Sequence, residues 1–203
     1  MCPLTSERGA MNDQTFVDGE ARWPTSVSVS RRIDVVPAVV FRVLTDPREH
    51  VSLDGSGMVR GPATDDAVLA GVGDIFVMKM HYPELGDYEM INHVVEYEPD
   101  RRITWEPEAG HGHPNSGRAK ARWGQRWTYD LRPAGPDATI VTETYDCSRV
   151  AEPERTRMNG GTTWTEAMTK SLQRLDDLCR RRSATECRST ALGSRARGSE
   201  PGV

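Results

Sequence analysis

Four polar side chains have the chemistry for proton transfer, and each lies in a segment where apolar residues alternate with polar ones. They are Asn92, Tyr129, Glu143 and Tyr145. A carboxyl group among apolar neighbours has a raised pKa and can then act as an acid or a base near neutral pH. Such a group could move a proton to or from an enolate. The alternative for Glu143 is an ion pair with an arginine at the rim of the site.

The remaining chemistry-bearing residues fit no established cofactor pattern. His111-Gly112-His113 places two imidazoles in a Gly-rich loop without carboxylate or thiol partners, so we interpret both as solvated and expect no metal. The sequence contains no Walker A, G-x-G-x-x-G, G-x-S-x-G or H-E-x-x-H pattern. Kinases, dehydrogenases, α/β-hydrolases and zincins are therefore not leading candidates, and we expect no cofactor.

Composition divides the 203 residues into an acidic body and a basic end. The net charge is −4, yet the stretch from Arg180 to the end holds six Arg and two Glu, which leaves the preceding residues at about −8. We therefore expect no nucleic-acid binding, although weak contact of the basic end with an anionic surface stays open. No apolar run is long enough to span a membrane, no signal peptide is recognisable, and the four cysteines are scattered, so we expect a cytoplasmic protein with reduced thiols.

The hydrophobic share of 36% and the mean hydropathy of −0.61 predict polar ends around one domain. We expect a disordered leader over 1–24, a folded domain over 25–180 and a disordered basic tail over 181–203. Within the domain, periodicity predicts a first strand, short helices, a series of antiparallel strands and a final helix. The final helix is expected over 158–178, because its apolar residues recur at intervals of three and four. The layout is α+β, with a curved sheet wrapped around that helix.

Several segments, in their order and spacing, resemble the START/Bet v1-like superfamily, and in particular its polyketide cyclase/dehydrase-like branch. These segments are VVPAVVFRVLTDP at 35–47, GDIF at 73–76, YEMINHV at 88–94, RITW at 102–105, WTYDL at 127–131 and TETYD at 142–146. The resemblance covers about 25–180. It implies a helix-grip fold and a cavity between sheet and helix that holds a small apolar ligand. It implies no shared catalytic motif.

Alternation along the strands and the helix predicts which side chains would line such a cavity. The predicted ligand-binding residues are Phe76, Met78, Met80, Tyr82, Met90, Asn92, Gln125, Trp127, Tyr129, Trp164, Met168 and Leu172. The alternative is that the same residues simply fill a core. In the strand 88–97 the inward face holds either Asn92 or His93, because a shift of one residue exchanges the two faces. We favour Asn92, since Met90 then joins Met78 and Met80.

Three functions remain in competition. The first is a carrier or sensor that binds a small hydrophobic molecule, such as a lipid or a polyketide-like compound. The second is a cyclase or dehydratase that acts on a polyketide-type precursor, with Asn92, Tyr129, Glu143 and Tyr145 as candidate catalytic residues. The third is a regulatory module that binds another protein. The sequence makes no prediction about the ligand's identity or the oligomeric state.

Overall fold

The computed structural model describes residues 15–17, 20–64, 68–117 and 122–196. Its centre is a seven-stranded antiparallel sheet in the order β3-β9-β8-β7-β6-β5-β4. The strands are β3 (Ser26–Ile33), β4 (Val59–Pro62), β5 (Ile75–Tyr82), β6 (Gly86–Glu98), β7 (Arg102–Ala109), β8 (Arg126–Pro133) and β9 (Thr139–Asp146). The helices are α1 (Pro37–Leu44), η1 (Pro47–Glu49), α2 (His50–Leu53), α3 (Glu152–Arg157), η2 (Asn159–Trp164) and α4 (Thr165–Ala196).

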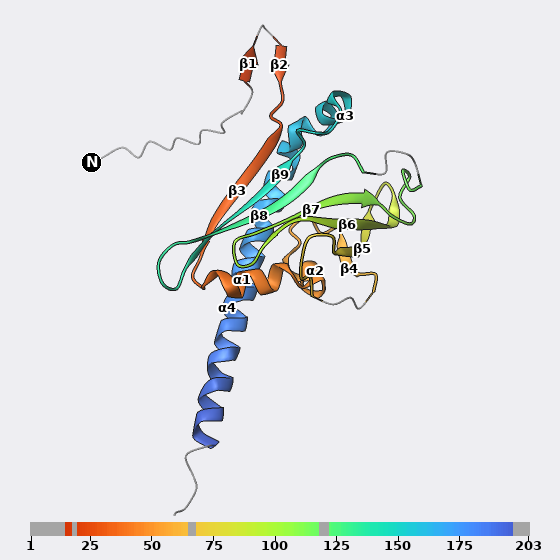
Figure 1. The fold of residues 1–203 in the computed structure, drawn as a ribbon. Helices are drawn as coiled ribbons and strands as arrows, with labels where there is room; N and C mark the ends of the chain where they lie inside the picture. Colours follow the sequence, from red (N-terminus) through yellow and green to blue (C-terminus); the bar gives the residue numbers. More distant parts are fainter. Residues whose placement is uncertain (1–14, 18–19, 65–67, 118–121, 197–203) are drawn as a thin grey trace, which may run out of the picture.

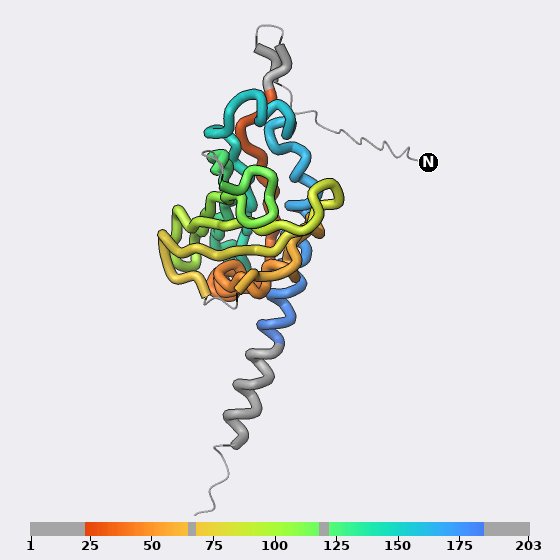
Figure 2. The backbone as a smooth tube through the Cα atoms, turned by 90° about the vertical axis from the view of Figure 1, so that its right-hand side faces the viewer, coloured from red at the N-terminus to blue at the C-terminus, as the bar shows by residue number. Residues whose placement is uncertain are grey.

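The long helix α4 packs against β3, α1 and α2 on one side of the curved sheet (Figure 1). Figure 2, which is turned by 90°, shows the sheet and α4 as two layers, with α3 and η2 at one end and α1 and α2 at the other. The predicted α+β helix-grip arrangement is confirmed, including the short helices after the first strand. Short helical elements therefore lie at both ends of the sheet and helix layers.

Local chemistry explains the short helices. Pro37 begins α1 with a backbone angle already suited to a helix, and the helix buries Val40, Val43 and Leu44. Thr45 ends the helix, and the backbone becomes extended at Asp46 (φ −103°, ψ 102°), because a residue that precedes proline disfavours the helical region. Asp46 then caps η1 by accepting a hydrogen bond from the Arg48 backbone N–H at 3.1 Å.

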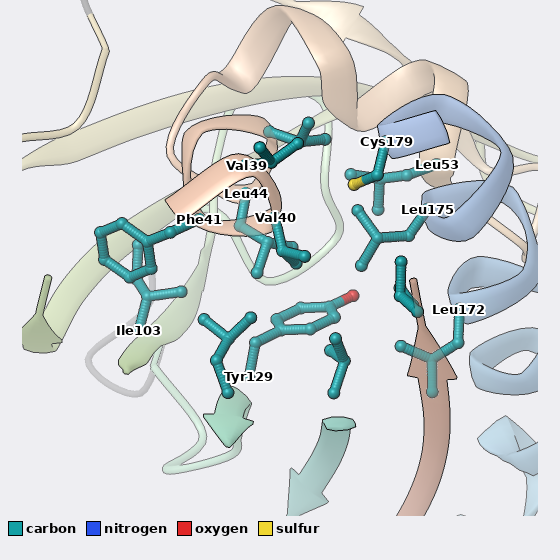
Figure 3. Close-up of a cluster of buried hydrophobic side chains, with 14 of the residues drawn as sticks. Val39, Val40, Phe41, Leu44, Leu53, Ile103, Tyr129, Leu172, Leu175 and Cys179 are labelled. Atoms are coloured by element: carbon teal, nitrogen blue, oxygen red, sulfur yellow. The ribbon is translucent and has the colours of Figure 1, made fainter. Parts of the chain in front are cut away.

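The core lies where α1 and α4 meet the inner face of the sheet. Figure 3 shows the Tyr129 ring from β8 between α1 and the Leu172 and Leu175 side chains of α4. Asp176, on the same helix, is almost fully buried and pairs with Arg31 of β3 at 2.9 Å and with Arg180 at 2.6 Å. This ion pair fixes the helix against the edge strand β3.

The final helix begins later than the sequence predicts. We expected a helix from Met158, but the backbone of Asn159, Gly160 and Gly161 has φ values of 50°, 62° and 90°. Three successive residues with positive φ break an α-helix, so they separate α3 from residues 162–164 of η2, which lead directly into α4 at Thr165. A side chain at Gly161 would place its Cβ 2.4 Å from the Tyr145 ring, so this glycine also allows η2 to approach the sheet closely.

Secondary structure extends beyond the expected domain of 25–180, whose bounds stay a prediction. A short hairpin of β1 (Thr15–Val17) and β2 (Glu20–Arg22) lies in the expected leader, and α4 continues to Ala196 in the expected tail. Elongating an anchored helix needs no new nucleation, and the tail is rich in the good helix formers Ala and Arg. Residues 1–14, 18–19 and 197–203 of these two segments lie outside the described residues.

Candidate functional site

A cavity of about 490 Å³ lies between the inner face of the sheet and α4. Strands β4 to β9 supply most of its wall, α4 supplies Ala167, Met168 and Ser171, and α3 with η2 closes one end. Protein interiors pack with few voids larger than one water molecule, whereas ligand pockets measure about 300–1,000 Å³. The space therefore has the size of a small-molecule site rather than of a packing defect.

Aromatic rings form much of the wall in two connected groups. Near η2, the Trp127 ring lies 4.8 Å from the Tyr145 ring and 5.7 Å from the Trp164 ring, measured between centroids. Near α2, Trp105 stacks on Tyr129 with centroids 5.6 Å apart. Large aromatic surfaces of this kind favour contact with an apolar or planar molecule over contact with water.

The carboxyl group of Glu143 is the most unusual polar group in the cavity. Glu143 is only 4% exposed, and its Oε2 atom has no hydrogen-bond partner among the described residues. Burial raises the pKa of Glu143 to about 8, although a hydrogen bond from Tyr129 favours the charged form and partly opposes this rise. The nearby charge of Asp54 raises the pKa further. Glu143 is therefore mainly protonated at neutral pH.

Tyr129 stands directly opposite Glu143 in the register of β8 and β9. Neighbouring side chains on one face of an antiparallel pair lie about 5 Å apart at Cβ, so the Tyr129 and Glu143 side chains are close enough to interact. Burial, followed by the charge of Glu143, raises the pKa of Tyr129 well above its usual value. Tyr129 therefore acts as a hydrogen-bond donor to Glu143 and does not ionise near neutral pH.

The other two candidates for proton transfer also line the cavity but already have partners. Asn92 donates through its amide nitrogen to the Met90 carbonyl at 3.3 Å. The Tyr145 hydroxyl contacts Gln125 Oε1 at 3.3 Å and the Met158 sulfur at 3.4 Å, and burial raises its pKa. Of the four residues, Glu143 is therefore the one with a buried polar atom left for a ligand, within the part of the chain that the structure describes.

The structure settles the two alternatives that the sequence left open. Asn92 faces the cavity, whereas His93 lies on the other face of β6, where its Nε2 is 2.6 Å from Glu108. The alternative arrangement for Glu143 does not occur: within the described residues, no arginine pairs with it. Its position in the middle of β9, on the inner face, keeps it away from the arginines of the outer surface.

Ten of the twelve predicted ligand-binding residues line the cavity, and two do not. The ten are Phe76, Met78, Met80, Met90, Asn92, Gln125, Trp127, Tyr129, Trp164 and Met168. Tyr82 lies at the end of β5 and is 40% exposed, because the strand passes beyond the cavity there. Leu172 is directed into the core between α1 and the sheet instead. Whether the ten bind a ligand stays a prediction.

Solved structures of the same architecture are numerous and distant in sequence. The chain matches the Zhui aromatase/cyclase of Streptomyces sp. R1128 with a TM-score of 0.54 at 13% identity, over 78% of this chain and 94% of that one. An AHSA1-like protein of Aeromonas hydrophila gives a TM-score of 0.51 at 16% identity, over 75% and 93% of the two chains. The fold is START/Bet v1-like.

Sequence comparison adds a relative but no function. No family model matches the sequence. An uncharacterized protein of Mycobacterium tuberculosis is 33% identical over 144 residues, which cover 71% of this chain and 56% of the relative. The chain thus spans little more than half the length of that protein. Within the described residues, no helix is long and apolar enough to cross a membrane.

Five side chains with aromatic or imidazole rings line the cavity but were not among the predicted site residues. They are His50, Tyr88, Trp105, His113 and Trp123. Tyr88 alternates with Met90, Trp105 with Ile103, and Trp123 with Gln125, so period-two signals could have identified these three. His50 and His113 lie outside strands, where this alternation gives no information.

His113 was not predicted to line the cavity, because its loop has no periodicity. We interpreted it as a solvated loop residue, but its ring lies 5.3 Å from both the Tyr88 and Trp123 rings, and burial lowers its pKa. His50 is nearly fully buried, with Nε2 2.9 Å from the Leu44 carbonyl oxygen and a pKa lowered by burial. Both imidazoles are therefore neutral members of the wall. The described residues contain no group of three or more His, Cys, Asp or Glu placed to hold a metal ion.

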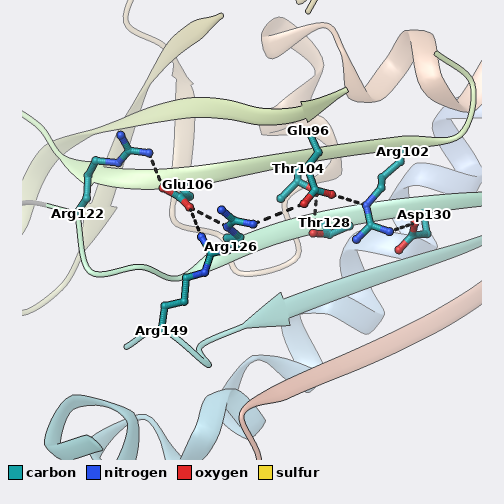
Figure 4. Close-up of polar contacts among 9 residues, drawn as sticks. All are labelled: Glu96, Arg102, Thr104, Glu106, Arg122, Arg126, Thr128, Asp130 and Arg149. Carbon is teal, nitrogen blue, oxygen red and sulfur yellow. Dashed lines mark hydrogen bonds and ion pairs between the residues drawn. The ribbon is translucent and has the colours of Figure 1, made fainter. Parts of the chain in front are cut away.

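The outer face of the same strands carries a network of ion pairs (Figure 4). Glu106 contacts Arg122, Arg126 and Arg149, the last two at 2.7 and 3.3 Å. Partial burial alone would raise the pKa of Glu106, but the hydrogen bonds from Arg126 and Arg122 lower it below its usual value. Charged groups on this face are thus matched with one another, in contrast to those in the cavity.

Proposed function

We propose that the chain binds a small, mainly apolar molecule in the cavity between the sheet and α4, as a carrier or sensor. The observation that carries this proposal is the 490 Å³ cavity, whose wall is mostly apolar and aromatic with a few buried polar groups. This combination is typical of small-molecule sites, in which apolar contact supplies affinity and a few polar groups supply orientation. The START/Bet v1-like fold of the distant neighbours supports the proposal.

The proposal is tested by filling the cavity without disturbing the rest of α4. Ala167→Trp places a large side chain in the cavity wall, whereas Gln173→Trp adds the same side chain on the exposed face of the same helix. Native mass spectrometry of the purified chain and thermal denaturation with added fatty acids and aromatic polyketides measure binding. We expect bound ligand and stabilisation in the wild type and in Gln173→Trp, and loss of both in Ala167→Trp. Equal stabilisation of the two variants would contradict the proposal.

A second candidate function is a cyclase or dehydratase that acts on a polyketide-type precursor. Glu143 favours it, because a buried carboxyl with a pKa of about 8 can accept a proton from a carbon next to a carbonyl and return one to the new alkoxide. The Tyr129 hydroxyl would hold the carboxylate in place during this exchange. A cavity that folds the substrate would supply the orientation that such a ring closure needs.

Measuring product formation distinguishes the binding function from the enzyme function. A polyketide synthase in the same reaction mixture would generate the precursor. The mixture would contain the wild type, Glu143→Gln or Tyr145→Phe, and the products would be identified by mass spectrometry. The enzyme function predicts loss of the cyclised product in Glu143→Gln with binding retained. A variant that loses binding, or a wild type that leaves the product distribution unchanged, would count against it.

A further inference from the structure

Two buried side-chain atoms lack a hydrogen-bond partner within the described residues, and both belong to the wall of the same cavity. They are Glu143 Oε2 and Trp164 Nε1. The Trp164 N–H is close enough to Tyr145 to favour its ionised form slightly, but it reaches no acceptor with hydrogen-bonding geometry. Buried polar atoms are nearly always paired in folded proteins, and leaving one unpaired destabilises the fold. A ligand that supplies the missing partners removes that penalty.

The two atoms flank an aromatic surface. Glu143 and Tyr145 project from the same face of β9, two residues or about 7 Å apart along the strand. The Tyr145 ring in turn lies 6.2 Å from the Trp164 ring, with Trp127 packed against both. A molecule in the cavity can therefore place an apolar body on these rings and direct polar atoms to Glu143, to Trp164 or to both.

The chemistry of the two atoms favours an oxygen acceptor on the ligand. An indole N–H is only a donor, and a protonated carboxyl donates through its own O–H. A carbonyl oxygen accepts from either group, and a hydroxyl can also donate to the carboxyl when it is ionised. An ammonium group accepts no hydrogen bond, so it would leave the Trp164 N–H unpaired.

The charges around the cavity disfavour an anion. Asp54 lines the cavity near Glu143 and raises the pKa of its carboxyl, so this end of the site is already acidic. Glu154 and Arg157 of α3 also line the cavity and carry opposite charges, so they add no net charge. The imidazoles of His50 and His113 are held neutral by burial. A ligand carboxylate buried beside Glu143 would thus face two acidic side chains, whereas Arg157, a cation of the wall, lies on α3 at the end of the cavity that α3 and η2 close.

We propose that the cavity selects an uncharged, mainly apolar molecule that carries a carbonyl or hydroxyl oxygen, and that it discriminates against carboxylates and amines of similar size. Glu143 and Trp164 are the residues that determine this specificity. The inference rests on the proposed function, because it names the class of ligand for the same cavity.

Four naphthalene derivatives of nearly equal shape test the inference on the full chain at pH 7. They are 2-ethylnaphthalene, 2-acetonaphthone, 2-naphthoate and 2-(aminomethyl)naphthalene, and titration calorimetry measures their affinities. We expect the ketone to bind about tenfold more tightly than the hydrocarbon, as one to two recovered hydrogen bonds allow. We expect the carboxylate and the amine to bind at least tenfold more weakly than the ketone.

Substitutions of Glu143 and Trp164 test whether these two residues cause the preference for the ketone over the hydrocarbon. Glu143→Leu removes the carboxyl and should bring the ratio of ketone to hydrocarbon affinity close to one, whereas Glu143→Gln keeps a donor and should retain most of the ratio. Trp164→Phe keeps a ring and removes the N–H, which should lower the ratio about threefold. Trp23→Phe is the matched control outside the cavity wall and should leave the ratio unchanged. If Glu143→Leu does not fold, the ratio in Trp164→Phe and Glu143→Gln decides the question.

The outcomes distinguish this inference from the function on which it rests. If the hydrocarbon binds in the cavity and the ketone has no advantage, the specificity is wrong while the proposed function stands. Tightest binding of the amine or of the carboxylate would also overturn the specificity. If none of the four compounds binds, the proposed function fails and the specificity fails with it.

Discussion

Glu106 and Glu143 project from opposite faces of the same sheet and have opposite surroundings. On the outer face, three arginines contact Glu106, and their hydrogen bonds lower its pKa despite partial burial. On the inner face, Glu143 has a hydrogen bond from Tyr129, no cation among the described residues pairs with it, and burial raises its pKa to about 8. The two residues are the same acid, so the difference comes entirely from position.

The comparison shows at which position this fold buries a carboxyl group at the expense of its stability. The outer network pairs its charges and is explained by stability alone. Stability does not explain the inner carboxyl of Glu143, because burying a leucine of similar size at the same position would cost less free energy. Groups held in costly states cluster at functional sites, which is why Glu143, and not Glu106, directs the functional proposals.

The largest expected effect is a pH dependence of stability that Glu143 causes. Its pKa is higher in the folded state, at about 8, than in the unfolded state, at about 4.5, so the folded state binds the extra proton between these values. The free energy of unfolding should therefore fall as pH rises from 4.5 to 8, by on the order of 5 kcal/mol. Urea denaturation across this range should show the fall in wild type and not in Glu143→Gln. If the free energy of unfolding falls equally with pH in both proteins, Glu143 does not cause the pH dependence.

The matched substitution on the outer face should have the opposite sign. Glu106→Gln removes a carboxylate with a lowered pKa, whose stabilising contribution is present above the unfolded pKa and is lost as pH falls through the folded pKa. At pH 7 we expect the variant to lose about 1–3 kcal/mol, because three arginines lose one carboxylate partner. The loss should shrink below pH 4. Urea denaturation at pH 7 and pH 3.5 measures it, and a loss that grows on acidification would contradict the assignment.

Tyr129→Phe tests the hydrogen bond that Glu143 receives on the inner face of the sheet. It removes the hydroxyl that favours the charged form of Glu143, so the pKa of Glu143 should rise further. We expect a loss of about 1 kcal/mol above pH 8, where the carboxylate is ionised, and a smaller loss below pH 6. The upper end of the pH-dependent fall in stability should move to higher pH. An unchanged position would show that Tyr129 does not interact with the carboxylate.

The smallest effect is expected at the exposed end of the outer network. Asp130 contacts Arg102 at 2.9 Å, but both side chains are more than a third exposed and Arg102 also pairs with Glu96. Asp130→Asn should therefore change the free energy of unfolding by less than about 0.5 kcal/mol. Raising the ionic strength should remove even this difference. A loss comparable to that of Glu106→Gln would mean that the network acts as one unit.

Periodicity in the sequence was sufficient for the architecture and for much of the cavity wall. Strands repeat every two residues and helices every 3.6, so alternation at Phe76, Met78 and Met80 placed these side chains on one face before any contact was known. The same rule failed at Tyr82, because alternation specifies a face but not how far along the strand the cavity extends. It also missed His113, whose loop has no period.

The sequence by itself determined the order of the main elements, the inward faces of β5 and β8 and the presence of a carboxyl and tyrosines among apolar residues. Only the tertiary structure decided that Asn92 rather than His93 faces inward, that Glu143 meets Tyr129 and, among the described residues, no arginine, and that Gly160 and Gly161 interrupt the helical path between α3 and α4. Faces follow from local geometry, which a sequence carries directly. Partners and pKa values depend on residues that are distant in the chain, and these come together only when the sheet curves around the helix.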